Sequence, residues 1–335
     1  MSEFSGRSRM SHIKINPIPI IIIAGPTASG KSGLGIELAK RLNGVIINAD
    51  SMQVYKEIPI LSAAPNSEEQ AQVPHKLYGI YEATNRGNIM DWLTLCRQEI
   101  DTARSQNLTP IIIGGTGMYL DGLLNGLSPI PETPQAIRDK VENMLQEKGL
   151  SHLYKILQDT DAKTAQKLSP NDSSRIRRAV EIWLDTNKPL SYWHNIPPQP
   201  FYPAQEFFKI YIKPPRSELD KRLRIRFDKM MEKGALDEVK KLLPLQLSDS
   251  LPAMRALGVQ ELKGYLENTY TLEEAIELGK LHTRQYAKRQ STWFNNRFNA
   301  DSIYEESFGS NTEKDNFFVN ELVDKLQKRY KILAK

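Results

Sequence analysis

The 335-residue sequence has little or none of several features, and each shortage excludes a class of protein. Its one cysteine, Cys96, allows no internal disulfide and no zinc site built from cysteines, so we expect a reducing compartment, the cytoplasm. No apolar run reaches the roughly 20 residues that a membrane-spanning helix needs, so we expect no membrane partner. No low-complexity tract interrupts a composition that is typical of globular proteins.

The N-terminus and the overall charge say little about partners. Residues 1–16 contain scattered arginine and serine but no apolar segment or small-residue cleavage site, so we interpret them as a disordered lead rather than a secretion signal. The net charge of +5 is too small to identify a partner by itself. The length fits two domains, or one large domain with an insertion.

The clearest motif begins at Gly25 and ends at Ser32. Four isoleucines precede it, and its sequence fits the G-x-x-x-x-G-K-[ST] template of a phosphate-binding P-loop. Small residues let backbone N–H groups surround an anion, and the helix that follows points its positive end at the same place. Lys31 adds a full charge, and the Ser32 hydroxyl can bind Mg²⁺. The residues predicted to bind a di- or triphosphate are Gly25, Pro26, Thr27, Ala28, Ser29, Gly30, Lys31 and Ser32.

Short runs of β-branched residues alternate with helical patterns in the first part of the chain. Residues 20–23, 45–47 and 110–113 read as buried strands, and residues 89–105 read as an amphipathic helix. Strands of this kind belong to a parallel sheet with helices on both faces. We therefore predict an α/β fold of the P-loop NTPase type.

The pattern changes between two proline-rich stretches, residues 128–134 and 197–203. Between them the apolar spacing is helical throughout, whereas strand character returns at residues 207–212. An all-helical insertion domain within a discontinuous core explains both observations. The predicted boundaries are 17–128 and 204–300 for the core with its helical C-terminal part, 129–203 for the insertion, and 301–335 for a peripheral tail and helix.

Asp50 follows a predicted strand and therefore lies at the sheet edge where parallel sheets bind ligands. There a carboxylate could hold Mg²⁺ through water, or accept a proton from a nucleophile beside the phosphate. An Asx-turn is the alternative, because Asp50 and Ser51 both favour turns. The glycine-rich turn from Gly114 to Gly117 shares this edge, although an ordinary strand–helix turn explains it nearly as well.

Basic residues gather in three predicted helices. The first carries Arg175 and Arg178 on one face of its opening turns, where cations oppose the helix dipole unless an anion meets them. The second contains Arg222, and the third places Arg284 and Lys288 on one face among aromatic residues. Such a mixture suits phosphate contacts and base stacking in a nucleic acid. Solvated charged surfaces are the alternative for each cluster taken alone.

These motifs resemble those of the tRNA dimethylallyltransferases. The matching stretches are residues 25–32, 49–55, 114–117, 170–179 and 283–294, and they run in family order through nearly the whole folded chain. The P-loop alone would be unspecific. Its combination with the Asp-Ser-x-Gln sequence and with the Thr-Arg-Gln-x-x-Lys-Arg-Gln helix makes the resemblance specific.

The resemblance implies transfer of a dimethylallyl group from dimethylallyl diphosphate to N6 of adenosine-37 in tRNA, with release of diphosphate. It implies that the anticodon stem-loop is gripped between core and insertion, with the target base flipped out of its stack. Mg²⁺ is the implied cofactor, and we expect a monomer. The P-loop motif is usually that of ATP-binding proteins, but this reading gives it a diphosphate leaving group instead.

The resemblance also implies residue roles. Asp50 is expected to be the general base, while Lys31, Ser32 and Arg222 act on the departing diphosphate and Ser32 binds the metal. Arg226 is a second choice for the diphosphate. The residues expected to contact tRNA are Asp50, Ser51, Met52, Gln53, Thr116, Arg138, Ser174, Arg175, Ile176, Arg177, Arg178, Arg284 and Lys288.

Three other functions fit part of the pattern. A P-loop small-molecule kinase would use Asp50 as base but leaves the arginine helices without a role. An adenylate isopentenyltransferase that acts on free nucleotide shares the chemistry but would not need the insertion. An RNA-binding NTPase switch would bind without group transfer. The loops at residues 61–65 and 256–261 depart from the usual family sequence, and we assign them no role.

Overall fold

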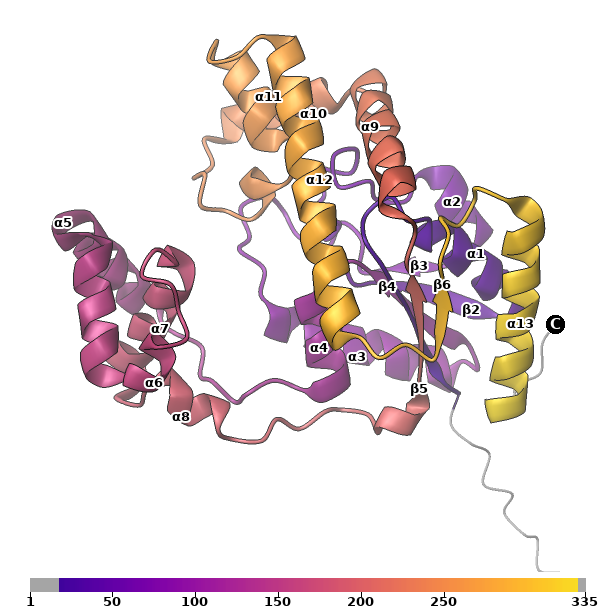
Figure 1. The fold of residues 1–335 in the computed structure, drawn as a ribbon, viewed down its shortest axis with the longest axis horizontal. Helices are drawn as coiled ribbons and strands as arrows, with labels where there is room; N and C mark the ends of the chain where they lie inside the picture. The colour runs from indigo at the N-terminus through magenta and orange to yellow at the C-terminus, as the bar shows by residue number, and fades with distance from the viewer. Residues whose placement is uncertain (1–17, 331–335) are drawn as a thin grey trace, which may run out of the picture. The chain divides into compact units, whose positions relative to one another are not determined.

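The computed structural model describes residues 18–330, and the predicted N-terminal lead lies outside them (Figure 1). The chain forms two compact units. One contains the residues up to Asp121 together with those from Tyr202 onward, and the other is Gly122–Phe201. The second unit therefore begins before the predicted residue 129 and ends before the predicted residue 203.

The first unit is built on a parallel sheet of six strands within the described residues, which confirms the predicted α/β fold. The spatial order is β3-β2-β4-β1-β5-β6, so the strand before the P-loop is central. Each neighbouring pair runs parallel. The strands are β1 (Ile20–Ala24), β2 (Gly44–Asn48), β3 (His75–Lys76), β4 (Thr109–Gly114), β5 (Phe207–Ile212) and β6 (Ser302–Tyr304).

All five residues of the central strand β1 are fully buried. A run of isoleucines suits a strand that is covered on both faces, since each face of the sheet receives alternate side chains. Ile21 and Ile23 belong to one apolar core with residues of α1 (Lys31–Arg41) and α13 (Thr312–Tyr330). Helix α3 (Ile89–Ser105) packs against β2 and β4, as its predicted amphipathic pattern requires.

The C-terminal segment differs from the predicted peripheral tail. Strand β6 pairs with β5, and α13 buries Phe318 and Leu322 in the core of the first unit. A three-residue edge strand that begins with Ser302 has too little periodicity to be found from sequence. Residues 331–335 of the predicted tail lie outside the described residues.

The remaining regular elements of the first unit are helices and short 3₁₀ turns. Helix α12 starts at a capping box in which the side chains of Thr271 and Glu274 each accept a hydrogen bond from the other residue's backbone N–H. The helices and 3₁₀ turns are α2 (Ser67–Gln72), η1 (Ala204–Glu206), α9 (Arg216–Glu232), α10 (Ala235–Leu242), η2 (Leu243–Leu245), η3 (Ala253–Arg255), α11 (Val259–Leu266) and α12 (Leu272–Arg297).

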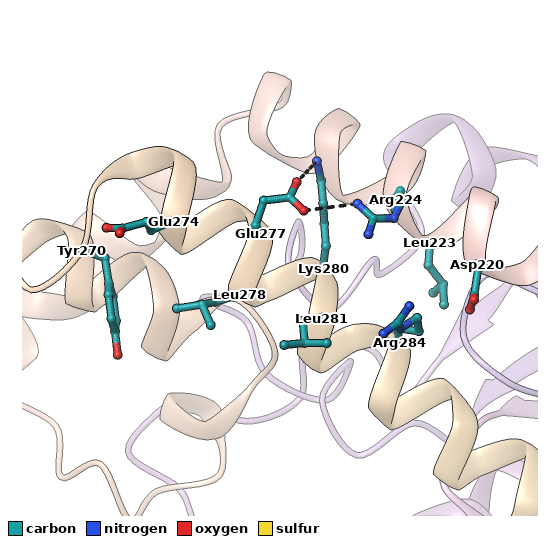
Figure 2. A pocket seen from close by; sticks show the side chains of 10 residues that line it. All are labelled: Asp220, Leu223, Arg224, Tyr270, Glu274, Glu277, Leu278, Lys280, Leu281 and Arg284. Carbon is teal, nitrogen blue, oxygen red and sulfur yellow. Dashed lines mark hydrogen bonds and ion pairs between the residues drawn. The ribbon is translucent and has the colours of Figure 1, made fainter.

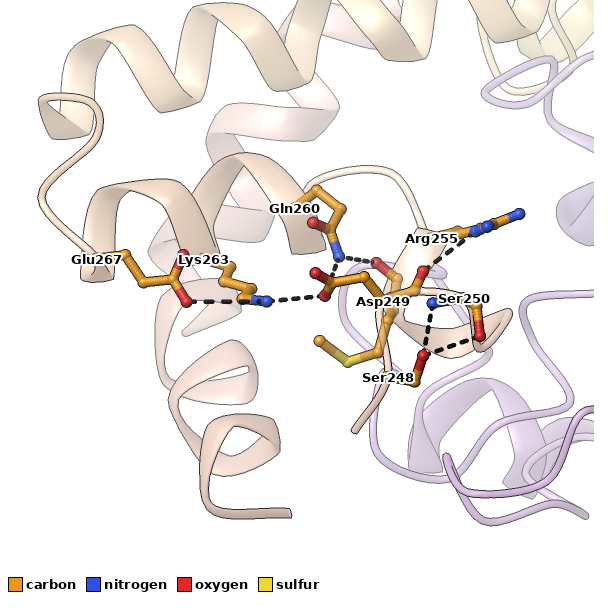
Figure 3. A network of polar contacts seen from close by, with 8 residues as sticks. Ser248, Asp249, Ser250, Arg255, Gln260, Lys263 and Glu267 are labelled. Carbon is orange, nitrogen blue, oxygen red and sulfur yellow. Dashed lines mark hydrogen bonds and ion pairs between the residues drawn. The ribbon is translucent and has the colours of Figure 1, made fainter. Parts of the chain in front are cut away.

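A polar network fixes the loop between α10 and α11 (Figure 3). Oδ1 of Asp249 lies 2.7 Å from Nζ of Lys263 and accepts a 3.2 Å hydrogen bond from the amide of Gln260. The same amide donates to the carbonyl of Met254 at 2.7 Å. These contacts hold the loop against α11, beside residues 255–257 that line a cavity described below.

The regular elements described in the second unit are helices. Their apolar core includes Val141, Leu153 and Ile176. Its helices are α5 (Gln135–Thr160), α6 (Ala162–Ala165), α7 (Ser173–Thr186) and α8 (Leu190–His194), while α4 (Gly117–Asn125) crosses the unit boundary. Gly149 has a φ of 78° and bends α5. Over the described residues, none of the helices combines the length and apolar character that crossing a bilayer requires.

Candidate active site

The P-loop joins β1 to α1 as predicted and contains two left-handed residues, Ala28 with φ 65° and Gly30 with φ 95°. Glycine is required at position 30, because a Cβ there would lie 2.3 Å from the carbonyl oxygen of Phe308. The ammonium group of Lys31 donates a 2.7 Å hydrogen bond to the carbonyl of Pro26. The side chain of Lys31 therefore reaches back to the start of the loop that precedes it.

Lys31 is a strongly perturbed cation of the site. Burial lowers its pKa from 10.5 to about 7, the charge of Asp50 opposes this shift, and the nearby Arg226 adds to it. The pKa of Arg226 is lowered as well, first by burial, with Asp50 opposing and Arg222 contributing. Several cations thus converge on a poorly solvated place, and a bound polyanion would relieve their mutual repulsion.

Arg222, predicted to reach the diphosphate, lies directly on the P-loop. Its Nε donates to the carbonyl of Ala28 at 3.0 Å, and its Nη2 donates to the carbonyl of Phe308 at 3.3 Å. Arg226 is one helical turn further along α9 and lines the same cavity. Helix α9 therefore supplies two arginines to the anion site.

The loop around Phe308 forms a part of the site that was not predicted from the sequence. The backbone N–H of Phe308 donates to the carbonyl of Ser29 at 3.0 Å. The loop is held by the buried carboxylate of Asp315, which accepts hydrogen bonds from the hydroxyl of Tyr304 at 2.7 Å and from the N–H of Gly309 at 2.8 Å. The predicted tail thus closes one side of the P-loop, and no local motif could have indicated it.

Asp50 follows β2 in a turn fixed by the buried Asn48. The side chain of Asn48 accepts a 2.8 Å hydrogen bond from the N–H of Asp50 and donates to the carbonyl of Leu77 at 3.0 Å. Asp50 makes the Asx-turn considered from sequence, because Oδ1 accepts the N–H of Met52 at 2.9 Å. The turn and a chemical role are compatible, since the same carboxylate also lines two cavities.

The glycine-rich turn lies next to Asp50, as the sheet-edge argument predicted. The hydroxyl of Thr116 accepts a 3.0 Å hydrogen bond from the N–H of Ser51. Helix α12 connects this turn to the P-loop: Oε1 of Gln290 accepts the N–H of Thr27, and Nε2 donates to the carbonyl of Gly115, both at 2.9 Å. Sequence reasoning gave Gln290 no role, because its partners are far away in the chain.

Two cavities meet at Asp50. The first, of about 670 Å³, extends along the P-loop and past Lys31, Ser32, Arg222, Lys229 and Lys233. The second, of about 310 Å³, has a largely apolar and aromatic lining. Residues lining only the second include Met52, Leu61, Phe227, Leu257, Tyr286 and Arg289. Residues lining both are Thr27, Asp50, Ser62, Arg226 and Met230. Asp50 therefore stands between a basic chamber and an apolar chamber.

Mg²⁺ was predicted to bind Ser32. No group of three His, Cys, Asp or Glu side chains among residues 18–330 is placed to hold a metal ion. The exposed Ser32 shares the basic chamber with the carboxylates of Asp50 and Glu69. Hydroxyl, carboxylate, water and phosphate oxygens are the ligands that Mg²⁺ accepts, so this donor set fits an ion that is held largely by its substrate.

The other residues predicted to contact tRNA are distributed over several surfaces, and among them Gln53 lines the basic chamber beside the P-loop. Gln53 donates to the carbonyls of Ser62 and Ala63, which gives it a role in holding the loop that follows. Arg284 lines a separate cavity of about 510 Å³ between α9 and α12, where Glu277 binds both Arg224 and Lys280 (Figure 2).

Lys288 and Arg284 together line a fourth cavity, of about 370 Å³, with Lys213 and Arg216. The predicted pair Arg284 and Lys288 therefore lines grooves outside the two chambers at Asp50, whereas Arg289 of the same helix lines the second chamber.

The basic helix of the second unit is α7. Its cations have partners within that unit: Arg175 pairs with Asp172, Arg177 lies 3.1 Å from a carboxylate oxygen of Glu142, and Arg178 donates to Thr133 at 2.6 Å. Asp172 also caps the helix by accepting the N–H of Arg175, as its position before the helix predicted. The predicted contacts Arg138, Ser174 and Ile176 lie in this unit too, although Ile176 is buried in its core.

Comparison with known proteins gives consistent matches. A tRNA dimethylallyltransferase of Granulibacter bethesdensis is 43% identical over 277 residues, which is 83% of this chain and 86% of that protein. The corresponding protein of Bartonella henselae is 43% identical over 282 residues, 84% of this chain and 97% of that protein.

Solved structures agree with the sequence matches. The full-length tRNA isopentenylpyrophosphate transferase of Bacillus halodurans gives a TM-score of 0.68 at 31% identity, over 94% of this chain and 98% of that chain. A eukaryotic dimethylallyltransferase acting on tRNA gives a TM-score of 0.75 at 28% identity, over 91% of this chain and 79% of that chain. The sequence profile described as IPP transferase matches residues 53–297. The resemblance found from the motifs is thereby confirmed, and the chain belongs to the IPP transferase family.

Proposed function

We propose that this protein transfers the dimethylallyl group of dimethylallyl diphosphate to N6 of adenosine-37 in tRNA. Membership of the family and its relatives' shared activity support the tRNA prenyltransferase function. The observation that carries the site assignment is the position of Asp50 between the two chambers. The basic chamber suits a diphosphate, and the apolar chamber suits a base and an allylic chain.

The reaction exchanges a C–O bond for a C–N bond and moves one proton. The N6 nitrogen attacks C1 of the allylic chain, the C1–O bond to the diphosphate breaks, and N6 loses a proton. Asp50 takes this proton as the general base. Lys31, Arg222 and Arg226 hold the diphosphate and stabilise the charge that it gains as it leaves. Mg²⁺, bound by Ser32 and the phosphate oxygens, would supply further charge neutralisation there.

The apolar chamber explains how a purine could be held for this chemistry. Tyr286 and Arg289 come from α12, while Phe227 comes from α9. A base that has left its stack is stabilised by aromatic and guanidinium surfaces of this kind. Burial raises the pKa of the Tyr286 phenol, and the charge of Asp50 raises it further, so Tyr286 stays a neutral hydrogen-bond donor at the reaction pH.

One assay distinguishes this function from its alternatives. Dimethylallyl diphosphate labelled in the allylic chain is incubated with unmodified tRNA, with AMP, and with ATP as competing substrates. We expect label in tRNA alone. Label in AMP would favour an adenylate isopentenyltransferase, and phosphate release from ATP without label transfer would favour a kinase or an NTPase switch.

The Asp50→Asn variant tests the base. It keeps an oxygen that can accept the N–H of Met52, so the fold and tRNA binding should be retained. Turnover should fall by about 10²- to 10⁴-fold, the usual contribution of a general base. Asp324→Asn, at an exposed position of α13, is the matched control. Intact turnover in Asp50→Asn would remove Asp50 from the mechanism. Action as a monomer in the cytoplasm remains a prediction.

A further inference from the structure

Gln290 is a buried polar side chain in the middle of α12, with 6% of its surface exposed. It uses both ends of its amide. The carbonyl oxygen accepts the N–H of Thr27 in the P-loop, and the NH₂ group donates to the carbonyl of Gly115, each at 2.9 Å. One side chain therefore joins the loops around Thr27 and Gly115, which are far apart in the sequence.

The packing around Gln290 leaves little room for another arrangement. A Cβ on Gly115 would lie 2.2 Å from Nε2 of Gln290, and a Cβ on Gly117 would lie 2.5 Å from the indole ring of Trp293. Real Cβ atoms do not approach other atoms so closely. The glycines of the second turn are thus needed for the close approach of α12, which delivers the amide to both loops.

The second loop is in turn connected to Asp50. Directly after Gly115, the hydroxyl of Thr116 accepts the N–H of Ser51 at 3.0 Å, and the backbone N–H of Thr116 reaches the carbonyl of Ala49 at 3.4 Å. These contacts flank Asp50 on both sides. Hydrogen bonds on either side of the Gly115–Thr116 peptide bond therefore connect the P-loop through Gln290 to the segment that carries the carboxylate.

We propose that Gln290 is a positioning residue that sets the separation between the diphosphate loop and the Asp50 carboxylate. The inference rests on the proposed function, in which the leaving group and the base act on opposite sides of one reacting centre. A primary amide fits the task because it accepts with one atom and donates with the other. Glutamate could accept from Thr27 but would set a carboxylate oxygen against the Gly115 carbonyl.

The positioning role makes a kinetic prediction that a purely structural role does not make. Displacing the P-loop from Asp50 should slow the transfer step itself, since small misplacements of reacting groups cost up to about 100-fold in rate. A contact that only supports the fold would lower the amount of folded enzyme and leave the rate per folded molecule unchanged. The single-turnover rate with both substrates saturating separates these cases.

The test uses the full chain and the nearly isosteric variant Gln290→Glu. Folded fraction is measured by circular dichroism and thermal unfolding, and rates are expressed per folded molecule. We expect a single-turnover rate reduced by about 10- to 100-fold, with the KM for tRNA within about twofold of wild type. Gln106→Glu is the matched control, because Gln106 is exposed at the end of α3 and lines none of the cavities described above.

A second variant protects the test against loss of folding. Gly115→Ala pushes a methyl group toward the same amide without changing α12, and it should produce the same kinetic defect. Wild-type single-turnover rates per folded molecule in both variants would overturn the inference. If wild-type enzyme itself transferred no label to tRNA, the proposed function would fail, and that outcome is distinct from a failure of the Gln290 variants alone.

Discussion

Replacing Lys31 by methionine should stabilise the folded protein while abolishing its anion site. Burial lowers the pKa of Lys31 from 10.5 to about 7 in the folded state. Between these two values the unfolded chain holds a proton that the folded chain has lost, so stability rises with pH across this window. Below about pH 7 the lysine is charged in both states and its full desolvation cost opposes folding.

The magnitude follows from the size of the shift. The difference between the pKa values of 10.5 and about 7 means that the charge of Lys31 lowers the free energy of unfolding by at most about 5 kcal/mol below pH 7. About 2 kcal/mol of this destabilisation remains at pH 9. Methionine also loses the hydrogen bond to the Pro26 carbonyl, which costs about 1 kcal/mol. Lys31 keeps some contact with solvent, so we expect a net gain of about 2 kcal/mol at pH 6 and little or none at pH 9.

Urea unfolding of both proteins at pH 6 and pH 9, in EDTA and without diphosphate, measures this difference. Groups that do not interact with Lys31 titrate equally in the two proteins and cancel. Lys40→Met, at an exposed position on the same helix, is the control and should show no such pH dependence. Added pyrophosphate should raise the stability of wild type only. A Lys31→Met protein that is less stable at pH 6, or whose advantage is equal at both pH values, would refute the reasoning.

Three further predictions concern other parts of the first unit. In Gly279→Ala, the new methyl carbon would lie 2.2 Å from the buried ring of Phe227. The resulting overpacking costs about 1–3 kcal/mol, which should exceed the gain of about 1 kcal/mol in helix propensity. The urea midpoint should therefore fall. An unchanged midpoint would show that α12 and α9 can separate freely. Lys288→Ala should weaken tRNA binding and reduce the salt slope by about 1, whereas no change in either would assign Lys288 to the solvated surface. Burial raises the pKa of the Cys96 thiol, so thiol reagents should label it only after unfolding, and rapid labelling of native protein would contradict its burial.

Local sequence was enough to predict the parts of the fold that depend on short-range pattern. The isoleucines of β1, the P-loop and the strand that delivers Asp50 each combine composition with an immediate turn or helix signal. Helix α3 has the bounds that its apolar period indicated. The family motifs then identified the function, which the comparisons support.

Long-range contacts could not be predicted in this way. Gln290 binds Thr27 across 263 positions of sequence, and nothing near either residue indicates the other. Glu238 of α10 is similar, since its buried carboxylate accepts the backbone N–H groups of Ile60 and Leu61. Partners of this kind are chosen by the packing of whole elements, and a single sequence carries no periodic signal for them.

The contact between the Phe308 loop and the P-loop has a consequence for the order in which the enzyme is made. A ribosome completes residues 25–32 early, yet β5, Arg222 and Phe308 are synthesised much later. The central strand β1 can pair with β4 once about a third of the chain has been made, but its other neighbour, β5, is synthesised later. Because non-local pairing is slow and entropically costly, the nascent protein should acquire its diphosphate site among the last steps of folding. A chain released before Phe308 would carry the complete P-loop motif without the wall that completes the site.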